Sequence, residues 1–256
     1  MDSTATLKSN LVRLQCTGIL ETIDERSRQA IDARWSPTEF LTKLLDDELT
    51  TRNNRKLERR LHKSHLDPTQ TIETFDFSVS SAHEPTIREL ALGRFMAQHE
   101  NILIVGPCGV GKSHLAQAIG HQVCRKGSHV LYQRTDHLLQ HIHTPPTEKM
   151  RTKRLQKTIN TDLLILDDFG LLPLSEPQQN TLYEIICQRY QKRSTIITSN
   201  RHFPEWLTVF NNPLIGSAAL DRIQHHAIRL TLHGESHRNR EFVRRNTPLM
   251  PQPANQ

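Results

Sequence analysis

From Thr86 onward, short apolar runs alternate with stretches in which apolar residues recur every three or four positions. The runs are typical of buried strands and the longer period of amphipathic helices. The predicted strands are 101–105, 128–133, 162–166, 194–199 and 227–232. The predicted helices are 86–98, 112–125, 135–142, 176–191, 203–209 and 213–225. Strands that alternate with helices predict an α/β fold, with a parallel sheet covered by helices on both faces.

The first 66 residues follow a helical period only, which predicts a small all-helical N-terminal domain. Residues 1–34 are expected to be helical, with a turn near Gly18. Ser36 and Glu39 form an S-x-x-E capping box, with Pro37 at the first helical position, and a helix is predicted from there to about His65.

Three further boundaries follow from composition. Residues 67–85 are mixed in pattern and are expected to form a linker, so the α/β domain is predicted to span 86–246. The Pro-rich tail 247–256 is expected to be disordered.

One turn between a predicted strand and a predicted helix has the spacing Gly106-x-x-x-x-Gly111-Lys112-Ser113. This is the phosphate-loop pattern in the context that it requires, so we predict a site for ATP and Mg²⁺. The backbone N–H groups and the helix N-terminus would bind phosphate oxygens, Lys112 would reach the β- and γ-phosphates, and the Ser113 hydroxyl would ligate Mg²⁺. The predicted nucleotide-binding residues are Gly106, Pro107, Cys108, Gly109, Val110, Gly111, Lys112, Ser113 and His114.

The apolar stretch "LLILDDFG" ends in two adjacent carboxylates, Asp167 and Asp168. Phosphate-loop proteins use an acid at the end of a second strand for the Mg²⁺ shell, and Asp167 fits that role. We assign Asp168 as the base that orients or deprotonates the attacking water. The alternative is that Asp168 only caps the following turn.

Charge and composition indicate the class of protein and its cellular location. The formal net charge is +6, and it divides unevenly: residues 1–85 hold 12 Lys and Arg against 14 Asp and Glu, whereas residues 86–256 hold 21 against 13. No apolar run approaches the about 18 residues of a membrane helix, and no secretory signal is visible. The four cysteines have no CxxC spacing, which favours a reducing compartment, and a cytoplasmic location is expected.

Two basic segments are candidates for contacts with DNA phosphates. The first lines one face of the predicted N-terminal helix: Arg52, Arg55, Lys56, Arg59, Arg60 and Lys63. The second lies within "EKMRTKRLQK": Lys149, Arg151, Lys153, Arg154 and Lys157. Because aromatic residues are few, phosphate contacts are favoured over base stacking. A solvated surface with nothing bound remains the alternative for both segments.

Three further segments stand in the order found in AAA+ ATPases. "STIITSNR" places Asn200 where that superfamily has its first sensor, and "SAALDRI" places Arg222 where it has an arginine finger that acts on a neighbouring subunit. The third segment, "GESHRNR", follows the last predicted strand. Together with "TRNNRKLERRL", "FDF", "LLILDDFG" and "GESHR", they resemble the IstB family of transposition ATPases, with the DnaC helicase loaders as relatives.

The resemblance implies a phosphate-loop AAA+ core that forms homo-oligomers on double-stranded DNA and presents target DNA to the transposase of the same element. The catalytic residues would be Lys112, Asp168, Asn200 and Arg222. The chain departs from the family pattern at Ser113, where Thr is common, and at His237, where Tyr is common. The second departure weakens the assignment of Arg238 as a further sensor.

Three other functions stay open from the sequence. A replicative helicase loader shares the same core and differs in its protein partner. A small-molecule kinase also needs a phosphate loop, but it would not account for Asn200, Arg222 and the basic segments. A scaffold could use ATP only as an assembly switch. Because Asp168 is shorter than the Glu common at its position, the free protein is expected to have low ATPase activity that duplex DNA stimulates.

Overall fold

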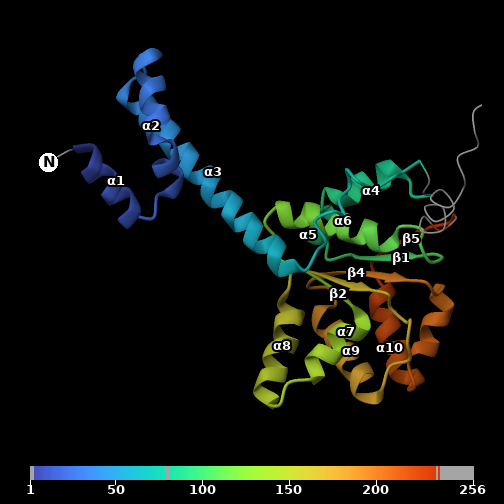
Figure 1. Ribbon diagram of the computed structural model, residues 1–256. Coiled ribbons are helices and arrows are strands. Elements are labelled where there is room, and N and C mark those ends of the chain that lie inside the picture. The colour runs from blue at the N-terminus through green and yellow to red at the C-terminus, as the bar shows by residue number, and fades with distance from the viewer. Residues whose placement is uncertain (1–2, 79–80, 235, 237–256) are drawn as a thin grey trace, which may run out of the picture. The chain divides into compact units, whose positions relative to one another are not determined.

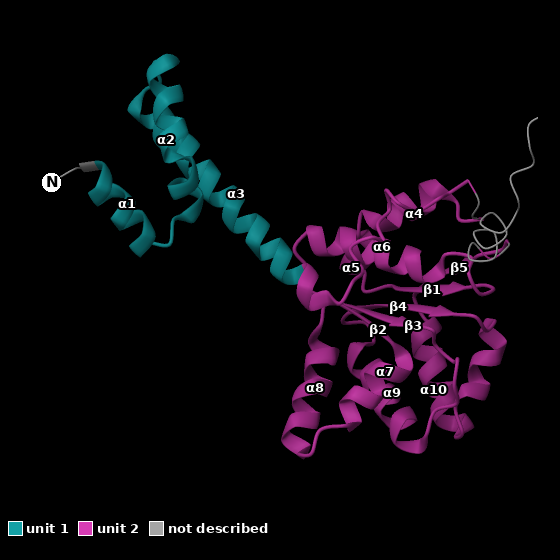
Figure 2. Cartoon of the chain, in the orientation of Figure 1, with its two compact units in different colours: residues 1–60 teal, residues 61–256 magenta. Residues whose placement is uncertain are grey.

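The computed structural model describes residues 3–78, 81–234 and 236 of the 256-residue chain. The chain divides into two compact units, 1–60 and 61–256 (Figure 2). The predicted disordered tail and Arg238 lie outside the described residues. Within the described residues, none of the helices is long and apolar enough to cross a membrane.

The first unit is helical, as the sequence predicts. Its helices are α1 (Ser3–Arg13), α2 (Thr17–Asp32) and most of α3 (Pro37–Ser64). The turn that the sequence places near Gly18 comes slightly earlier, at residues 14–16, and Gly18 belongs to α2. Buried apolar side chains from all three helices form a small core: Leu11, Ile19, Ile23 and Leu44.

The second unit contains a five-stranded sheet in the order β2-β3-β4-β1-β5, with every pair of neighbours parallel (Figure 1). The strands are β1 (Asn101–Val105), β2 (Val130–Arg134), β3 (Leu163–Asp167), β4 (Ser194–Ser199) and β5 (Ala227–Thr231). The helices are α4 (Glu84–Ala91), α5 (Arg94–Ala97), α6 (Lys112–Arg125), α7 (Thr135–His143), α8 (Glu148–Asn160), α9 (Glu176–Arg189), the 3-10 helix η1 (Phe203–Val209) and α10 (Pro213–Gln224).

Helices cover both faces of this sheet, which confirms the predicted α/β class. One face packs against α4, α5 and α6, and the other against α7, α8, α9 and α10 (Figure 1). Successive strand residues point to opposite faces, so Ile102 and Ile104 join the first core while Leu103 and Val105 join the second. Because both faces are buried, the strands read as continuous apolar runs.

Three elements differ from the sequence prediction. The expected helix 86–98 is interrupted at Gly93, which has φ +73°, a conformation that favours glycine, so it forms α4 and α5 instead. The basic segment after α7 forms α8, a helix absent from the predicted order. The periodicity of apolar residues did not predict this helix, because only Leu155, Thr158 and Ile159 of α8 are buried.

The expected linker 67–85 is packed on the second unit. Ile72, Phe75 and Ala82 are buried, and side chains of α6 bind the backbone of this segment. Gln117 accepts a hydrogen bond from the Asp67 N–H at 2.9 Å, and His121 Nε2 lies 2.8 Å from the Asp67 carbonyl oxygen. The segment is therefore part of the second unit, whose boundary falls at residue 61.

Candidate nucleotide-binding site

The predicted phosphate loop joins the carboxyl end of β1 to the start of α6. Two of its glycines have backbone conformations and neighbours that exclude a side chain. Gly109 has φ +80°, and a Cβ there would lie 2.1 Å from Ser236 Oγ. Gly111 has φ +96°, and a Cβ would lie 2.7 Å from the Phe75 ring. At these two positions the loop has no side chain, so its backbone N–H groups can surround a phosphate.

Lys112 and Ser113 begin α6, so they lie at the helix N-terminus, which carries a partial positive charge. The Lys112 side chain is buried, and its Nζ donates a hydrogen bond to the Pro107 carbonyl at 2.7 Å. This bond places the ammonium group across the loop itself. Pro107 and Cys108 are exposed, so the loop is open to solvent on that side.

The segment before α4 supports the loop from one side. The Phe75 ring packs edge-on against the Phe77 ring at 4.8 Å and the His114 ring at 5.1 Å between centroids. His114 Nε2 in turn lies 2.8 Å from the Thr71 carbonyl oxygen. His114, predicted from the sequence to bind nucleotide, therefore contributes to holding this segment against the start of α6.

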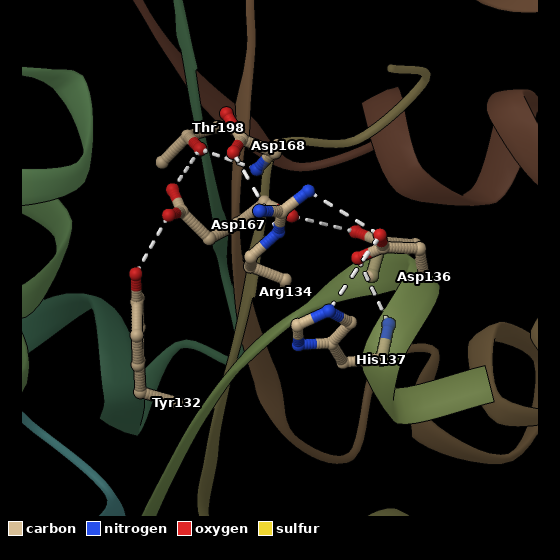
Figure 3. A network of polar contacts seen from close by, with 8 residues as sticks. Tyr132, Arg134, Asp136, His137, Asp167, Asp168 and Thr198 are labelled. Carbon is tan, nitrogen blue, oxygen red and sulfur yellow. Dashed lines mark hydrogen bonds and ion pairs between the residues drawn. The ribbon is translucent and has the colours of Figure 1, made fainter. Parts of the chain in front are cut away.

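Asp167 is the last residue of β3 and Asp168 follows it, so both carboxylates lie at the same edge of the sheet as the phosphate loop, where parallel α/β sheets bind ligands. Asp167 is buried, and both of its oxygens accept hydrogen bonds from hydroxyl groups on neighbouring strands (Figure 3). The Tyr132 hydroxyl donates to Oδ2 at 2.6 Å, and the Thr198 hydroxyl donates to Oδ1. Asp167 is thus held in one orientation.

Asp168 is in the left-handed region, with φ +52°, and its N–H donates to the Thr198 hydroxyl at 3.1 Å. Burial, together with the charge of Asp167, raises the pKa of the Asp168 carboxyl, while the cations of Arg134 and Lys112 oppose the rise. Arg134 Nε lies 3.9 Å from Asp168 Oδ2, and its Nη2 lies 3.3 Å from Asp136 Oδ2 (Figure 3). A raised pKa makes a carboxylate a stronger base, which suits the role predicted for Asp168.

Asn200 follows β4 directly and therefore lies at the carboxyl ends of the strands, like the phosphate loop. No side-chain hydrogen bond is recorded for Asn200 within the described part of the chain. Arg222 belongs to the opposite edge: it lines a small cavity with Asn101, the first residue of β1, and Arg193. Its Nη1 donates to the Ala218 carbonyl at 2.7 Å, and its guanidinium lies 5.6 Å from the centre of the Tyr183 ring.

The donors at the phosphate loop fit a magnesium nucleotide. Ser113 and Asp167 offer a hydroxyl and a carboxylate, the hard oxygen ligands that Mg²⁺ prefers. No group of three or more His, Cys, Asp or Glu side chains able to hold a metal occurs among residues 3–78, 81–234 and 236. A divalent ion here would therefore depend on phosphate oxygens and water for its remaining ligands.

The two basic segments are less uniform than their sequences suggest. In α8, Lys149, Lys153 and Lys157 are exposed at i, i+4 and i+8, whereas Arg154 donates to the His141 carbonyl at 2.6 Å and Arg151 pairs with Glu148 at 3.5 Å. The lysines thus form one exposed stripe.

In α3, two of the arginines stabilise the first unit. Arg52 pairs with Glu48 at 2.6 Å, and Arg55 donates to the Thr17 hydroxyl and pairs with Glu21 at 3.7 Å. Lys56 and Arg59 are exposed on the same helix.

Sequence reasoning missed Tyr132, Arg134 and Thr198, which surround the acid pair. Thr198 could have been found, because it precedes the predicted sensor by two residues and the β3–β4 register brings it beside Asp167. Tyr132 and Arg134 stand on β2, where alternate residues share a face. No motif marks them.

Comparisons with known proteins identify the family of the chain. The family model described as IstB-like ATP binding protein matches residues 9–244. An insertion sequence ATP-binding protein of Sinorhizobium fredii is 38% identical over 219 residues, covering 85% of this chain and 74% of that protein. The insertion sequence IS21 ATP-binding protein of Pseudomonas aeruginosa is 33% identical over 232 residues, covering 90% and 88%.

Solved structures share the fold. The DnaC helicase loader superposes with a TM-score of 0.50 at 24% identity, covering 68% of this chain and 98% of that one. The replication initiator DnaA bound to AMPPCP and single-stranded DNA gives a TM-score of 0.55 at 22% identity, covering 73% and 58%. The chain therefore belongs to the IstB family of insertion sequence ATP-binding proteins, with an AAA+ phosphate-loop fold.

Proposed function

We propose that this protein is an ATP-hydrolysing regulator of transposition that oligomerises on duplex DNA in the cytoplasm and delivers target DNA to the transposase of its insertion sequence. The observation that carries the proposal is the position of the Asp167–Asp168 pair, which lies at the same sheet edge as the glycine loop and Lys112. The names of its relatives, insertion sequence ATP-binding proteins, support the biological setting.

The residues at the carboxyl ends of the strands have different roles in ATP hydrolysis. Lys112 and the N–H groups of the loop bind the β- and γ-phosphates, and Ser113 with Asp167 would hold Mg²⁺, which supplies charge neutralisation when it is bound. Asp168 orients the attacking water and accepts its proton. Asn200 follows β4 at the same edge and would position that water or the γ-phosphate.

Arg222 completes the site of a second copy. The phosphate loop of the same copy is at the far end of β1, and the first and last Cα atoms of a five-residue strand are about 13 Å apart at ~3.3 Å per step. An arginine held at the opposite edge suits a contact made across an interface between copies. There its cation would stabilise the charge that develops on the transferred phosphoryl group.

Duplex DNA would bind through phosphate contacts. The exposed lysine stripe of α8 supplies positive charge, and α8 contains no aromatic residue that could stack on a base. Binding through such a surface depends only weakly on the DNA sequence. The exposed α3 residues Lys56 and Arg59 are a second contact surface. Low sequence selectivity suits a protein that selects insertion targets.

Helicase loading is the second candidate function, because the DnaC helicase loader has the same fold over most of its length. The two functions differ in their protein partner. Capture by the purified transposase of the same element, and not by a replicative helicase, is expected for the transposition function.

The test uses Asp168→Asn, which keeps the size of the side chain and removes the base. The variant is expected to bind ATP and assemble on duplex DNA while its DNA-stimulated turnover falls about 100-fold or more. Unchanged turnover would remove Asp168 from the mechanism. A wild-type protein that turns over ATP equally with and without duplex DNA would contradict the coupling to DNA.

A further inference from the structure

A hydrogen bond joins Tyr132, in the middle of the outermost strand β2, to Asp167 of the candidate site. Tyr132 lies on β2 opposite Ile165 of β3, and its side chain extends along the sheet to Asp167, two residues farther on. Its hydroxyl donates to Oδ2 at 2.6 Å (Figure 3). This is a short bond of the kind formed with a charged acceptor.

The bonds to Asp167 leave part of each carboxylate oxygen available. A carboxylate oxygen has about two lone-pair sites, and one on each oxygen of Asp167 is taken by a hydroxyl, from Tyr132 or Thr198. The second site on each oxygen can accept a bond from a metal ion or from a water molecule bound to one. Two donors on opposite oxygens also prevent the carboxylate from rotating.

The two donors differ in what else they touch. The Thr198 hydroxyl also accepts a bond from the Asp168 N–H, so it affects both acids. The Tyr132 hydroxyl contacts Asp167 alone among the bonds recorded in the described residues.

We propose that Tyr132 is a positioning residue for the metal shell: it fixes the Asp167 carboxylate in the orientation that receives the divalent cation of a bound nucleotide. This inference rests on the proposed ATP site and adds a residue to it. Partners that orient a metal-binding group in this way are worth about 10–100-fold in metal affinity.

The variant Tyr132→Phe removes one oxygen and keeps the ring, so the packing around it is retained. Mn²⁺ serves as the probe, because its binding to the protein in the presence of ATP can be followed by electron paramagnetic resonance. We expect the affinity for Mn²⁺ to fall about tenfold, while a fluorescent ATP analogue binds with unchanged affinity in EDTA.

Tyr190→Phe is the matched control. It loses a phenol bond to His225 Nδ1 at 2.9 Å, and Tyr190 lies at the opposite edge of the sheet with Asn101, so its Mn²⁺ affinity should equal that of the wild type.

Unchanged Mn²⁺ affinity in Tyr132→Phe would overturn the inference, and so would an equal loss of analogue binding in EDTA, because that result means a packing role. If the wild-type protein binds no ATP analogue at all, the proposed function fails instead.

Discussion

Different neighbours hold the two carboxylates at the end of β3, and this explains how adjacent like charges coexist there. Asp167 is fixed by two neutral hydroxyls, whereas Asp168 faces the cations of Arg134 and Lys112. Because Asp168 is only partly buried and its pKa is raised, it suits the role of a base. Asp167 is the more rigid acid and suits the metal shell.

Removal of the Arg134 charge should shift the pH dependence of ATP hydrolysis. Arg134 lowers the pKa of Asp168, so Arg134→Met raises it further, and a smaller fraction of Asp168 is ionised at a given acidic pH. The acid limb of the pH–rate profile is therefore expected to move to higher pH. Steady-state rates measured from pH 5 to 9 check this.

Arg94→Met is the control for that experiment. Arg94 is exposed and pairs with Glu89 at 2.8 Å, away from the acids. An acid limb that stays in place in Arg134→Met, or moves equally in both variants, would contradict the role of Arg134.

The sequence marks the loop and the acid pair of the candidate site, but it does not mark the residues that hold them in place. The spacing from Gly106 to Ser113 identifies the loop because the backbone geometry itself requires those residue types. Tyr132 and Thr198 act through tertiary contacts between strands, which no local pattern encodes. The same is true of Arg222, whose opposite-edge position appears only in the folded sheet.

At the scale of elements, the long helix α3 shows which local signals are reliable. Its predicted capping box is present: the Ser36 N–H donates to Glu39 Oε2 at 2.7 Å, and the Glu39 N–H donates to Ser36 Oγ at 3.2 Å. The linker prediction for 67–85 was less successful, because that segment is held by α6 side chains rather than by a pattern of its own.

Glu48 of α3 binds the start of α2. Its Oε2 accepts from the N–H groups of Gly18 at 2.7 Å and Ile19 at 3.2 Å, so a buried carboxylate satisfies a helix N-terminus. Gly18 permits this approach, because a Cβ there would lie 2.8 Å from the Asp47 carbonyl oxygen. Burial raises the pKa of Glu48, but hydrogen bonds from Arg52, Ile19 and Gly18 bring it below its ordinary value.

Glu48→Ala should therefore destabilise the first unit by about 1–2 kcal/mol, the usual cost of a lost N-terminal cap. Hydrogen exchange of amides in α1, α2 and α3 should become faster, with amides of the sheet as the internal reference. Glu25→Ala, at an exposed residue of α2, should leave exchange unchanged. Equal exchange in Glu48→Ala and wild type would contradict the capping role.

A pH dependence follows from the same carboxylate. Because its folded pKa is depressed, its contribution is complete above the ordinary Glu value of about 4.3 and is lost as pH falls through the folded pKa. The difference in exchange rate between wild type and Glu48→Ala should shrink below pH 4. A difference that persists at pH 2 would mean that charge is unimportant there.

At the scale of the whole molecule, the basic residues on the two faces of the sheet differ. The α8 lysines are exposed and form no ion pair with the described part of the chain, whereas Arg88, Arg94 and Arg125 of the opposite helical layer each pair with a glutamate. A face with unpaired cations attracts phosphates more strongly than one whose cations are neutralised.

Replacement of the α8 lysines Lys149, Lys153 and Lys157 by alanine should weaken duplex DNA binding in the presence of a non-hydrolysable ATP analogue. Each lost phosphate contact reduces the slope of log affinity against log salt by about 0.9. The control replaces Arg88, Arg94 and Arg125 and should keep the wild-type slope. Equal slopes in all three proteins would exclude α8 from the DNA interface.

Mixing two inactive variants tests most directly whether ATP is hydrolysed between copies. Lys112→Ala disables its own site but retains Arg222, and Arg222→Ala retains its own site. Each variant alone should lack DNA-stimulated turnover. An equal mixture should recover roughly a quarter of the wild-type rate, since about one interface in four then joins an intact loop to an intact arginine. A mixture as inactive as its components, although both assemble on DNA, would contradict this account.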